Sequence, residues 1–161
     1  MQRHRSQFIV DAPRAKVWRA LHPPAPPGAE RPRLIEYPGG SIEVLFEGDA
    51  AGEGLVRTCT FPVPKLIGGR ARSWECIVEA REGEFSRYMA VGKPLWSRAE
   101  GTQEYEDTPE GGTKVTFTES YEVLSKVTRF LERYVHRFIS KRNDETIEKY
   151  LGHIGPVRRL A

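Results

Sequence analysis

The feature that most limits what this chain can fold into is a long stretch, residues 41–123, in which apolar and polar side chains alternate. Alternation with a period of two places successive side chains on opposite faces of a β-strand. Clusters of Gly, Pro and Asp interrupt the pattern at short intervals, and short turns of this kind join antiparallel neighbours. The expected strands span residues 41–47, 55–63, 73–81, 85–91, 95–107 and 114–123. The stretch therefore predicts an antiparallel meander with one face that needs cover.

A single long helix is expected to supply that cover. Residues 125–151 contain no Pro or Gly and many good helix formers, so about 27 residues can form a helix about 40 Å long. Ser125 suits the N-cap and Gly152 the position just beyond the C-terminal end. An apolar stripe follows one face, with further apolar residues at its margins: Val127, Leu131, Tyr134 and Phe138, with Phe130 and Val135 beside them. Beyond Ile139 the apolar positions move to another sector.

The residues before the meander complete the expected fold. Residues 5–10 predict an opening strand, and a short helix then starts at Pro13 and carries Val17, Trp18 and Leu21. We expect the end of the long helix, at Ile147 and Leu151, to pack against this short helix or the segment after it. Six prolines in residues 23–40 predict an irregular connector there.

These elements together predict an α+β fold in which a curved seven-stranded antiparallel sheet wraps around the long C-terminal helix and leaves a space between them. The length of 161 residues favours one domain over 1–161, with 152–161 as a C-terminal tail.

Composition excludes several classes of function. The net charge of +3 comes from basic residues that are dispersed, which argues against a nucleic-acid interface. No apolar run approaches the roughly 18 residues of a membrane span, and the first residues do not form a secretory signal, so we expect a cytoplasmic protein. Cys59 and Cys76 are read as reduced thiols, since they lack the number and spacing of a disulfide framework or zinc site. No metal or other cofactor is expected, and monomer and homodimer stay open.

Two segments carry a resemblance to a known family: APRAKVWRAL at Ala12–Leu21 and GGTKVTF at Gly111–Phe117. With the long closing helix, they make the chain resemble the START-like (Bet v 1-like, SRPBCC) superfamily, and within it the polyketide cyclase/dehydrase and lipid-transport proteins. The resemblance implies a helix-grip fold whose cavity, between curved sheet and closing helix, takes an apolar or amphipathic molecule. Many members have a second short helix where this chain has the proline-rich residues 23–40.

One pair of residues could carry chemistry in such a space. If the last strand turns Val115 and Phe117 toward the helix, Glu119 and Tyr121 also point inward. Desolvation would raise the pKa of Glu119 and suit it to general acid or base catalysis, unless an arginine such as Arg57 or Arg98 lies in reach. The alternatives are a register shift that exposes Glu119 and a structural Arg–Glu pair.

The residues expected to line a ligand site are mostly aromatic, with an arginine and a glutamate among them, although ordinary core packing is the alternative for each aromatic residue. They are Arg57, Trp74, Tyr88, Trp96, Tyr105, Phe117, Glu119, Tyr121, Phe130, Tyr134 and Phe138. Neither face of residues 95–107 is uniformly apolar, and a bulge near Gly101 would bring both Trp96 and Tyr105 inside. The four histidines, His4, His22, His136 and His153, all lie outside the expected strands, so we expect no histidine base in the cavity.

Three functions follow from this reading. The first is binding or carrying a hydrophobic small molecule, such as a lipid, a polyketide or a related ring compound. The second is a polyketide cyclase or dehydratase that uses Glu119 and Tyr121. The third is a protein-interaction module that uses the basic helix surface and the terminal VRRLA segment. Whether a reaction is catalysed stays open, because a fold does not fix a function.

Overall fold

The structure is a computed structural model that describes residues 2–29, 32–37, 40–62, 65, 68–93, 96–123 and 132–160. It contains nine strands and two helices within these ranges. In chain order they are β1 (Gln2–Val10), α1 (Arg14–Leu21), β2 (Arg33–Tyr37), β3 (Gly40–Phe46), β4 (Val56–Pro62), β5 (Arg70–Arg81), β6 (Phe85–Lys93), β7 (Trp96–Asp107), β8 (Thr113–Val123), α2 (Glu132–Gly152) and β9 (Val157–Leu160).

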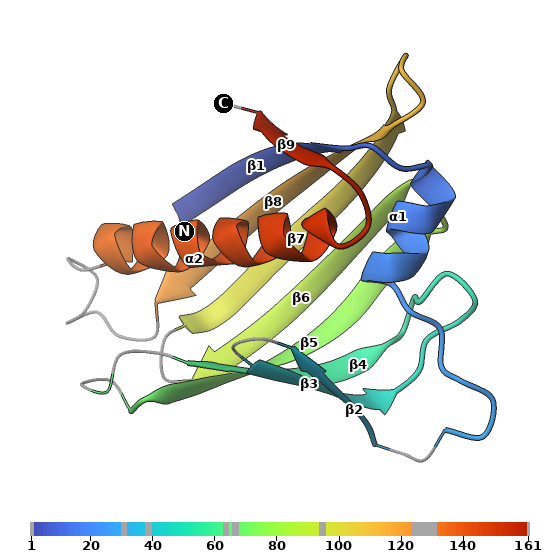
Figure 1. Ribbon diagram of the computed structural model, residues 1–161. Helices are drawn as coiled ribbons and strands as arrows, with labels where there is room; N and C mark the ends of the chain where they lie inside the picture. Colours follow the sequence, from blue (N-terminus) through green and yellow to red (C-terminus); the bar gives the residue numbers. More distant parts are fainter. Residues whose placement is uncertain are drawn as a thin grey trace.

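All nine strands form one sheet in the order β2-β3-β4-β5-β6-β7-β8-β1-β9, and each neighbouring pair is antiparallel. The sheet curves around α2, which lies across its concave side, while α1 lies at one end (Figure 1). The meander from β3 to β8 follows the alternation of the sequence. Its last hairpin turns at Gly111, whose φ of +84° is readily adopted only by glycine. The antiparallel sheet and closing helix predicted from the sequence are thereby confirmed.

The prediction of seven strands was wrong, because two segments expected to be irregular add strands at the edges of the sheet. Within the proline-rich connector, residues 33–37 pair with β3. Residues 157–160, expected to be a tail, pair with β1 as β9. Arg159 of β9 also donates a hydrogen bond to the buried carboxylate of Asp144 in α2. The terminal segment is therefore part of the sheet.

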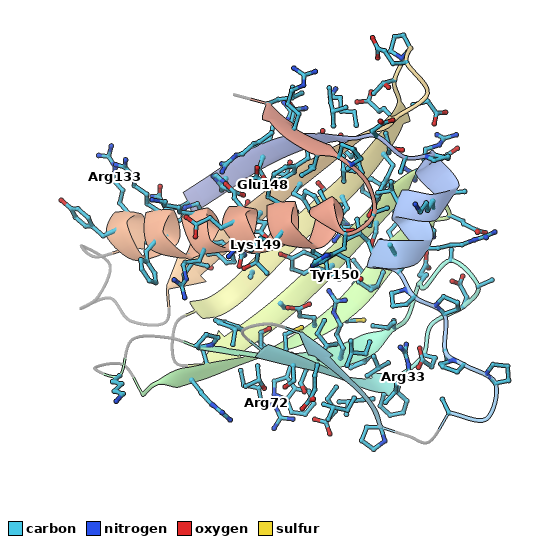
Figure 2. The ribbon with its side chains drawn as sticks, in the orientation of Figure 1. Arg33, Arg72, Arg133, Glu148, Lys149 and Tyr150 are labelled. Carbon is cyan, nitrogen blue, oxygen red and sulfur yellow. The ribbon has the colours of Figure 1, made fainter. Side chains whose placement is uncertain are left out.

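The apolar core lies at the end of the sheet where α1 meets the C-terminal half of α2. Its buried members are Phe8, Val10, Ala12, Val17, Trp18, Tyr105, Val115, Phe117 and Leu151. Ile147 and Leu21 pack against this cluster, and Tyr150 Oη donates a 2.7 Å hydrogen bond to the Ala20 carbonyl at the place where Figure 2 shows Tyr150 beside α1. The predicted contact between the end of the long helix and the short helix is confirmed.

The apolar stripe predicted for the first half of the long helix does not face the sheet. Tyr134 and Phe138 are 73% and 52% exposed, so the prediction that they lie under the sheet was wrong. The buried side of α2 is instead the side that carries Leu151. Asp144 and Ser140 lie on the same side, about two and three helical turns before Leu151, and are 1% and 2% exposed. His4 of β1 and Arg159 of β9 form hydrogen bonds with Asp144. The predicted helix start at Ser125 and the stripe residues Val127, Phe130 and Leu131 lie outside the described residues.

None of the helices in the described ranges is long and apolar enough to cross a membrane.

Candidate functional site

The candidate site is built on the concave face of the sheet, where residues paired directly across strands share a face. Two adjacent rows cross this face beneath α2. One row contains Arg57, Glu75, Ala90, Ala99 and Tyr121. The other contains Ile77, Tyr88, Gly101, Glu119 and His4.

Glu119 is the centre of a hydrogen-bonded cluster that joins two strands, β6 and β8, to the helix. Tyr121 Oη donates to Glu119 Oε2 at 2.5 Å, and Tyr88 Oη donates to Glu119 Oε1 at 3.4 Å. From α2, Asn143 Nδ2 donates to Glu119 Oε2 and to Tyr121 Oη, both at 3.2 Å. The cluster therefore fixes how α2 sits over β6 and β8.

The absence of a side chain at Gly101 makes this cluster feasible. Gly101 lies between Tyr88 and Glu119 in its row. A Cβ atom at residue 101 would lie 2.4 Å from Cε1 of the Tyr88 ring, closer than any ordinary contact. The missing side chain thus lets the Tyr88 ring lie across β7 and reach Glu119. The bulge expected at Gly101 is not found, and the irregular pairing lies instead between Trp96 and Arg98.

Burial shifts the pKa values of this cluster in the direction that favours the neutral forms of its side chains. Desolvation raises the pKa of Glu119, although hydrogen bonds from Tyr121 and Asn143 act in the opposite direction. The pKa values of Tyr88 and Tyr121 are also raised, chiefly by desolvation and then by the charge of Glu119. Glu119 forms no ion pair with Arg57 or Arg98 in the described part of the chain. A carboxyl group with a raised pKa can hold or give up a proton, which general acid–base chemistry requires.

An ion pair lies on the same concave face, across β4 and β5. Arg57 Nε donates to Glu75 Oε2 at 2.9 Å, and Ser73 Oγ donates to Glu75 Oε1 at 2.9 Å. Burial disfavours the charge of Arg57, but the charge and hydrogen bond of Glu75, together with Cys59 and Tyr88, outweigh burial and raise the pKa of the guanidinium. Both side chains nevertheless keep accessible surface, 22% for Arg57 and 14% for Glu75. Next to them, burial raises the pKa of Cys59 to about 12, so this thiol is not a nucleophile.

A third polar group lies where α1 meets the sheet. The His22 ring stacks on Trp18 at 3.9 Å between centroids, and its Nε2 atom is 3.1 Å from Gln103 Oε1 and 3.2 Å from Tyr105 Oη. Tyr105 Oη donates to the same Gln103 oxygen at 2.7 Å. Burial, followed by the charge of Arg57, lowers the pKa of His22 to about 4. Histidines outside the expected strands therefore lie beside concave-face residues, both His22 and His136, whose ring lies 5.2 Å from that of Tyr121.

The concave face differs sharply between its two ends. At the α1 end, large side chains such as Phe8, Phe117 and Trp18 pack together. Around Tyr121 the buried cluster instead consists of three alanines, Ala71, Ala90 and Ala99, which are 2%, 5% and 1% exposed. Phe61, Tyr88 and Ile139, which are partly buried, pack against this cluster.

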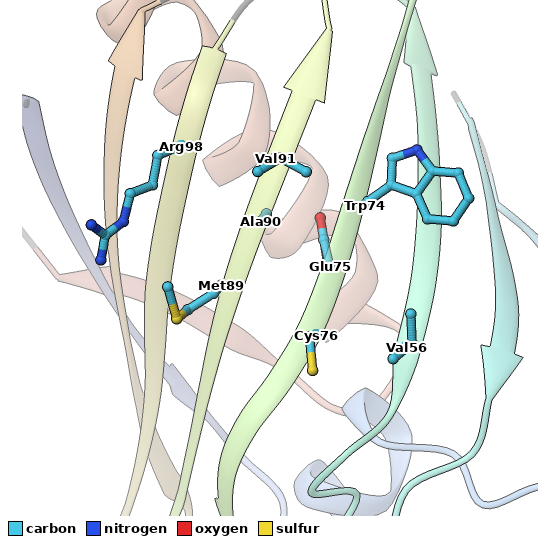
Figure 3. A pocket seen from close by; sticks show the side chains of 8 residues that line it. All are labelled: Val56, Trp74, Glu75, Cys76, Met89, Ala90, Val91 and Arg98. Atoms are coloured by element: carbon cyan, nitrogen blue, oxygen red, sulfur yellow. The ribbon is translucent and has the colours of Figure 1, made fainter.

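Trp74 lies on the outer face of the sheet, so its predicted position was wrong. Trp74 was expected to line the cavity, but it points away from α2 and is 48% exposed. With Met89, Val91 and Val56 it lines a pocket of about 490 Å³. Figure 3 shows these side chains in front of the strands, with α2 behind. The reason is the parity of β5: Glu75 and Ser73 turn inward toward Arg57, so Trp74 turns outward.

The structure brings together four of the predicted site residues on the concave face: Arg57, Tyr88, Glu119 and Tyr121. Tyr105 and Phe117 also face inward, but within the packed apolar end. Tyr134 and Phe138 of α2 and Trp74 of β5 are exposed elsewhere. Phe130 and the side chain of Trp96 lie outside the described residues.

Sequence reasoning missed the two residues that complete the polar groups, Glu75 and Asn143. Glu75 is the neighbour of Trp74, which was expected to line the cavity, and adjacent residues of a strand face opposite sides of the sheet. Asn143 could have been found by stepping back in helical turns from Ile147 and Leu151, the apolar residues that mark the buried side of α2. Within the described ranges, no group of three or more His, Cys, Asp or Glu side chains could hold a metal ion.

No family model and no curated protein matches this sequence. Solved structures do match. Ara h 8.0201 has a TM-score of 0.64 at 16% identity, over 95% of this chain and 97% of that one. The Zhui aromatase/cyclase from Streptomyces sp. R1128 has a TM-score of 0.61 at 16% identity, over 95% and 93%. The di-domain ARO/CYC BexL of the BE-7585A biosynthetic pathway has a TM-score of 0.65 at 16% identity, over 95% of this chain and 46% of that one.

These likenesses concern the fold, because the sequence identities are low. The chain has the Bet v 1-like (START-like, SRPBCC) helix-grip fold, as its sequence pattern indicated.

Proposed function

We propose that this protein binds a hydrophobic small molecule, of the lipid, polyketide or related ring-compound kind, between the concave face of the sheet and α2. The observation that carries the proposal is the contrast between the two ends of that face. One end is a packed apolar core. The other is lined by alanines and by the polar side chains of Arg57, Glu75 and Glu119. A fully packed core does not need buried polar groups, whereas a ligand site uses a few of them to orient its ligand.

Partial exposure of inward-facing groups supports this assignment. Arg57 and Glu75 point toward α2, and their side chains are 22% and 14% exposed. On α2 itself, His136 Nε2 and Ser140 Oγ are buried and have no hydrogen-bond partner in the described part of the chain. Groups of this kind can serve a polar atom of a ligand. We therefore assign the polar contacts to Arg57, Tyr88, Glu119 and Tyr121, joined by Glu75 and Asn143.

The names of two similar structures agree with this class of ligand. Zhui is an aromatase/cyclase and BexL is a di-domain ARO/CYC. A fold that holds ring-forming substrates in those proteins is suited to a ring compound or an acyl chain here, although the fold alone does not choose among them.

Variants with larger side chains on the concave face test the proposed binding site. Ala90→Leu and Ala99→Leu place larger side chains on the concave face, beside Tyr121. Thermal unfolding of the wild type in the presence of lipids, polyketides and quinones should show an upward shift with at least one class, and native mass spectrometry of protein purified from its source should show a bound apolar molecule. The two variants should lose the shift while staying folded.

Val91→Leu provides the matched control, because Val91 is the next residue on β6 but faces outward and is 56% exposed. It should bind as the wild type does. Finding no bound molecule and no thermal shift with any of the three ligand classes would refute the proposal.

A second candidate function is a cyclase or dehydratase reaction on a carbonyl compound. The observation that favours it is the 2.5 Å hydrogen bond between Tyr121 and Glu119, whose pKa is raised. In this reading Glu119 transfers the proton and a tyrosine hydroxyl binds the substrate carbonyl. Glu119→Gln should abolish turnover of a bound polyketide-like compound and leave its binding intact. Unchanged turnover would exclude Glu119 as the acid or base.

A further inference from the structure

The exposed side of α2 in residues 133–142 has an unusual composition. Tyr134 and Phe138, one helical turn apart, are 73% and 52% exposed. Four basic residues surround them, and all four are exposed: Arg133, Arg137, Lys141 and Arg142. We call these six residues the aromatic–basic face of α2.

The basic residues of this face have no acidic partner within the part of the chain that the structure describes. None of the four forms an ion pair with any residue in the described ranges, whereas Arg33, Arg57 and Arg72 elsewhere each pair with a glutamate. Within 133–142 no acidic residue lies on the exposed side, and exposed acids return only at Glu145. Figure 2 shows Arg133 at the outer end of α2, directed away from the sheet. The face therefore presents four unpaired positive charges next to two aromatic rings.

The geometry points to an anionic membrane surface as the partner of the aromatic–basic face. Lys and Arg side chains near such a surface are attracted to anionic headgroups, and aromatic rings settle at the depth of the headgroups, where one end is apolar and the other wet. The aromatic residues favour a lipid surface over an acidic protein, because two projecting rings need no matching pocket on a bilayer. This inference concerns a surface opposite the ligand site and is independent of the proposed function.

Flotation with lipid vesicles tests the inference. The wild type should float with vesicles of phosphatidylcholine and phosphatidylserine and not with vesicles of phosphatidylcholine alone. Binding should weaken steeply as salt rises to about 1 M, where the Debye length is about 3 Å. The double variant Arg137→Glu and Lys141→Glu should bind about 25-fold more weakly or worse, from about fivefold for each basic residue lost.

The matched control is Arg3→Glu with Arg5→Glu, which changes the net charge equally at two exposed residues of β1. It should keep most of the binding. A Phe138→Trp variant gives a separate readout: brominated lipids should quench its fluorescence more than that of the wild type, whose Trp18 is 3% exposed and whose Trp74, 48% exposed, lies on the outer face of the sheet. Circular dichroism would establish that all variants are folded.

Three results would overturn the inference: no flotation with anionic vesicles, equal loss of binding in the Arg3 and Arg5 control, or no quenching of Trp at residue 138. Capture of an acidic protein or a nucleic acid by the same face without vesicle binding would also contradict it.

Discussion

Glu119 shows how a buried carboxyl group can be balanced between two protonation states. Desolvation favours its neutral form, and that effect is larger than the opposing hydrogen bonds from Tyr121 and Asn143. The donors around it belong to different elements, β6, β8 and α2. A ligand that displaced one donor would shift the balance further toward the protonated acid.

The smallest change that disturbs this cluster is Gly101→Ala. The added Cβ would lie 2.4 Å from the Tyr88 ring, so the ring must move away from Glu119. We expect the free energy of unfolding to fall by about 1–3 kcal/mol, as for other overpacked sites. Urea unfolding measures this change, and tyrosine absorbance measures the altered surroundings of Tyr88.

Combining Gly101→Ala with Tyr88→Ala removes the obstructing ring and provides the check. The added methyl group should then cost much less than it does in the wild-type background. An equal cost in both backgrounds would show that the Tyr88 ring is not the reason for glycine at this position.

At the scale of the elements, Asp144 joins α2 to two strands. Its carboxylate is 1% exposed and accepts hydrogen bonds from Arg159 of β9 and from His4 of β1, the latter at 2.9 Å. The helix is therefore held by a polar anchor near its middle and by the apolar contacts of Leu151 near its end.

Asp144→Ala should lower the free energy of unfolding by about 2–4 kcal/mol, because the partners of a buried carboxylate lose their counter-charge. Arg159 is 40% exposed and can be partly hydrated, which keeps the loss below that of a fully buried pair. Chemical denaturation measures it. Glu145→Ala, at the next and exposed residue of α2, should change stability by less than about 0.5 kcal/mol. Equal effects of the two changes would contradict the anchor.

The elements also show what the sequence could and could not predict. Alternation located β3 to β8 within a few residues, and it turned Glu119 and Tyr121 toward the helix, because their strand is regular throughout. Trp74 of β5 was expected on the concave face, but it lies on the outer face, and the Arg57–Glu75 ion pair lies inside. This is the reverse of the usual distribution of apolar and charged residues. The rotation of α2 was predicted wrongly because Tyr134 and Phe138 have the apolar character of core residues. The side of the helix that is buried depends on contacts with residues far away in the sequence, which a local pattern does not reveal.

At the scale of the whole molecule, the buried histidine between α1 and the sheet makes stability depend on pH. The pKa of His22 is about 4 in the folded protein and 6.5 when unperturbed. The unfolded chain therefore binds the proton first as the pH falls, so stability is full above about pH 6.5 and declines toward pH 4. The loss amounts to at most about 3 kcal/mol at 1.36 kcal/mol for each pKa unit.

Thermal or urea unfolding at several pH values between 7 and 4 would measure this decline. His22→Gln keeps a neutral donor and should flatten it. His136, whose pKa is also lowered by burial, acts with the same sign, so the difference between wild type and His22→Gln isolates His22. Glu119 acts in the opposite direction, because its raised pKa makes the folded state lose stability as the pH rises above 4.5. A decline that is identical in His22→Gln and wild type would disprove the role of His22.

The position of β1 between β8 and β9 has a consequence for biosynthesis. β1 precedes its partner β8 by about a hundred residues: Ala12 and Thr113, which close the far end of that pairing, are 101 residues apart. At about 5–20 residues per second, the ribosome needs roughly 5–20 s to supply β8. During that time the apolar side chains of Phe8 and Val10 are without their core, and exposed apolar surface of this kind favours aggregation.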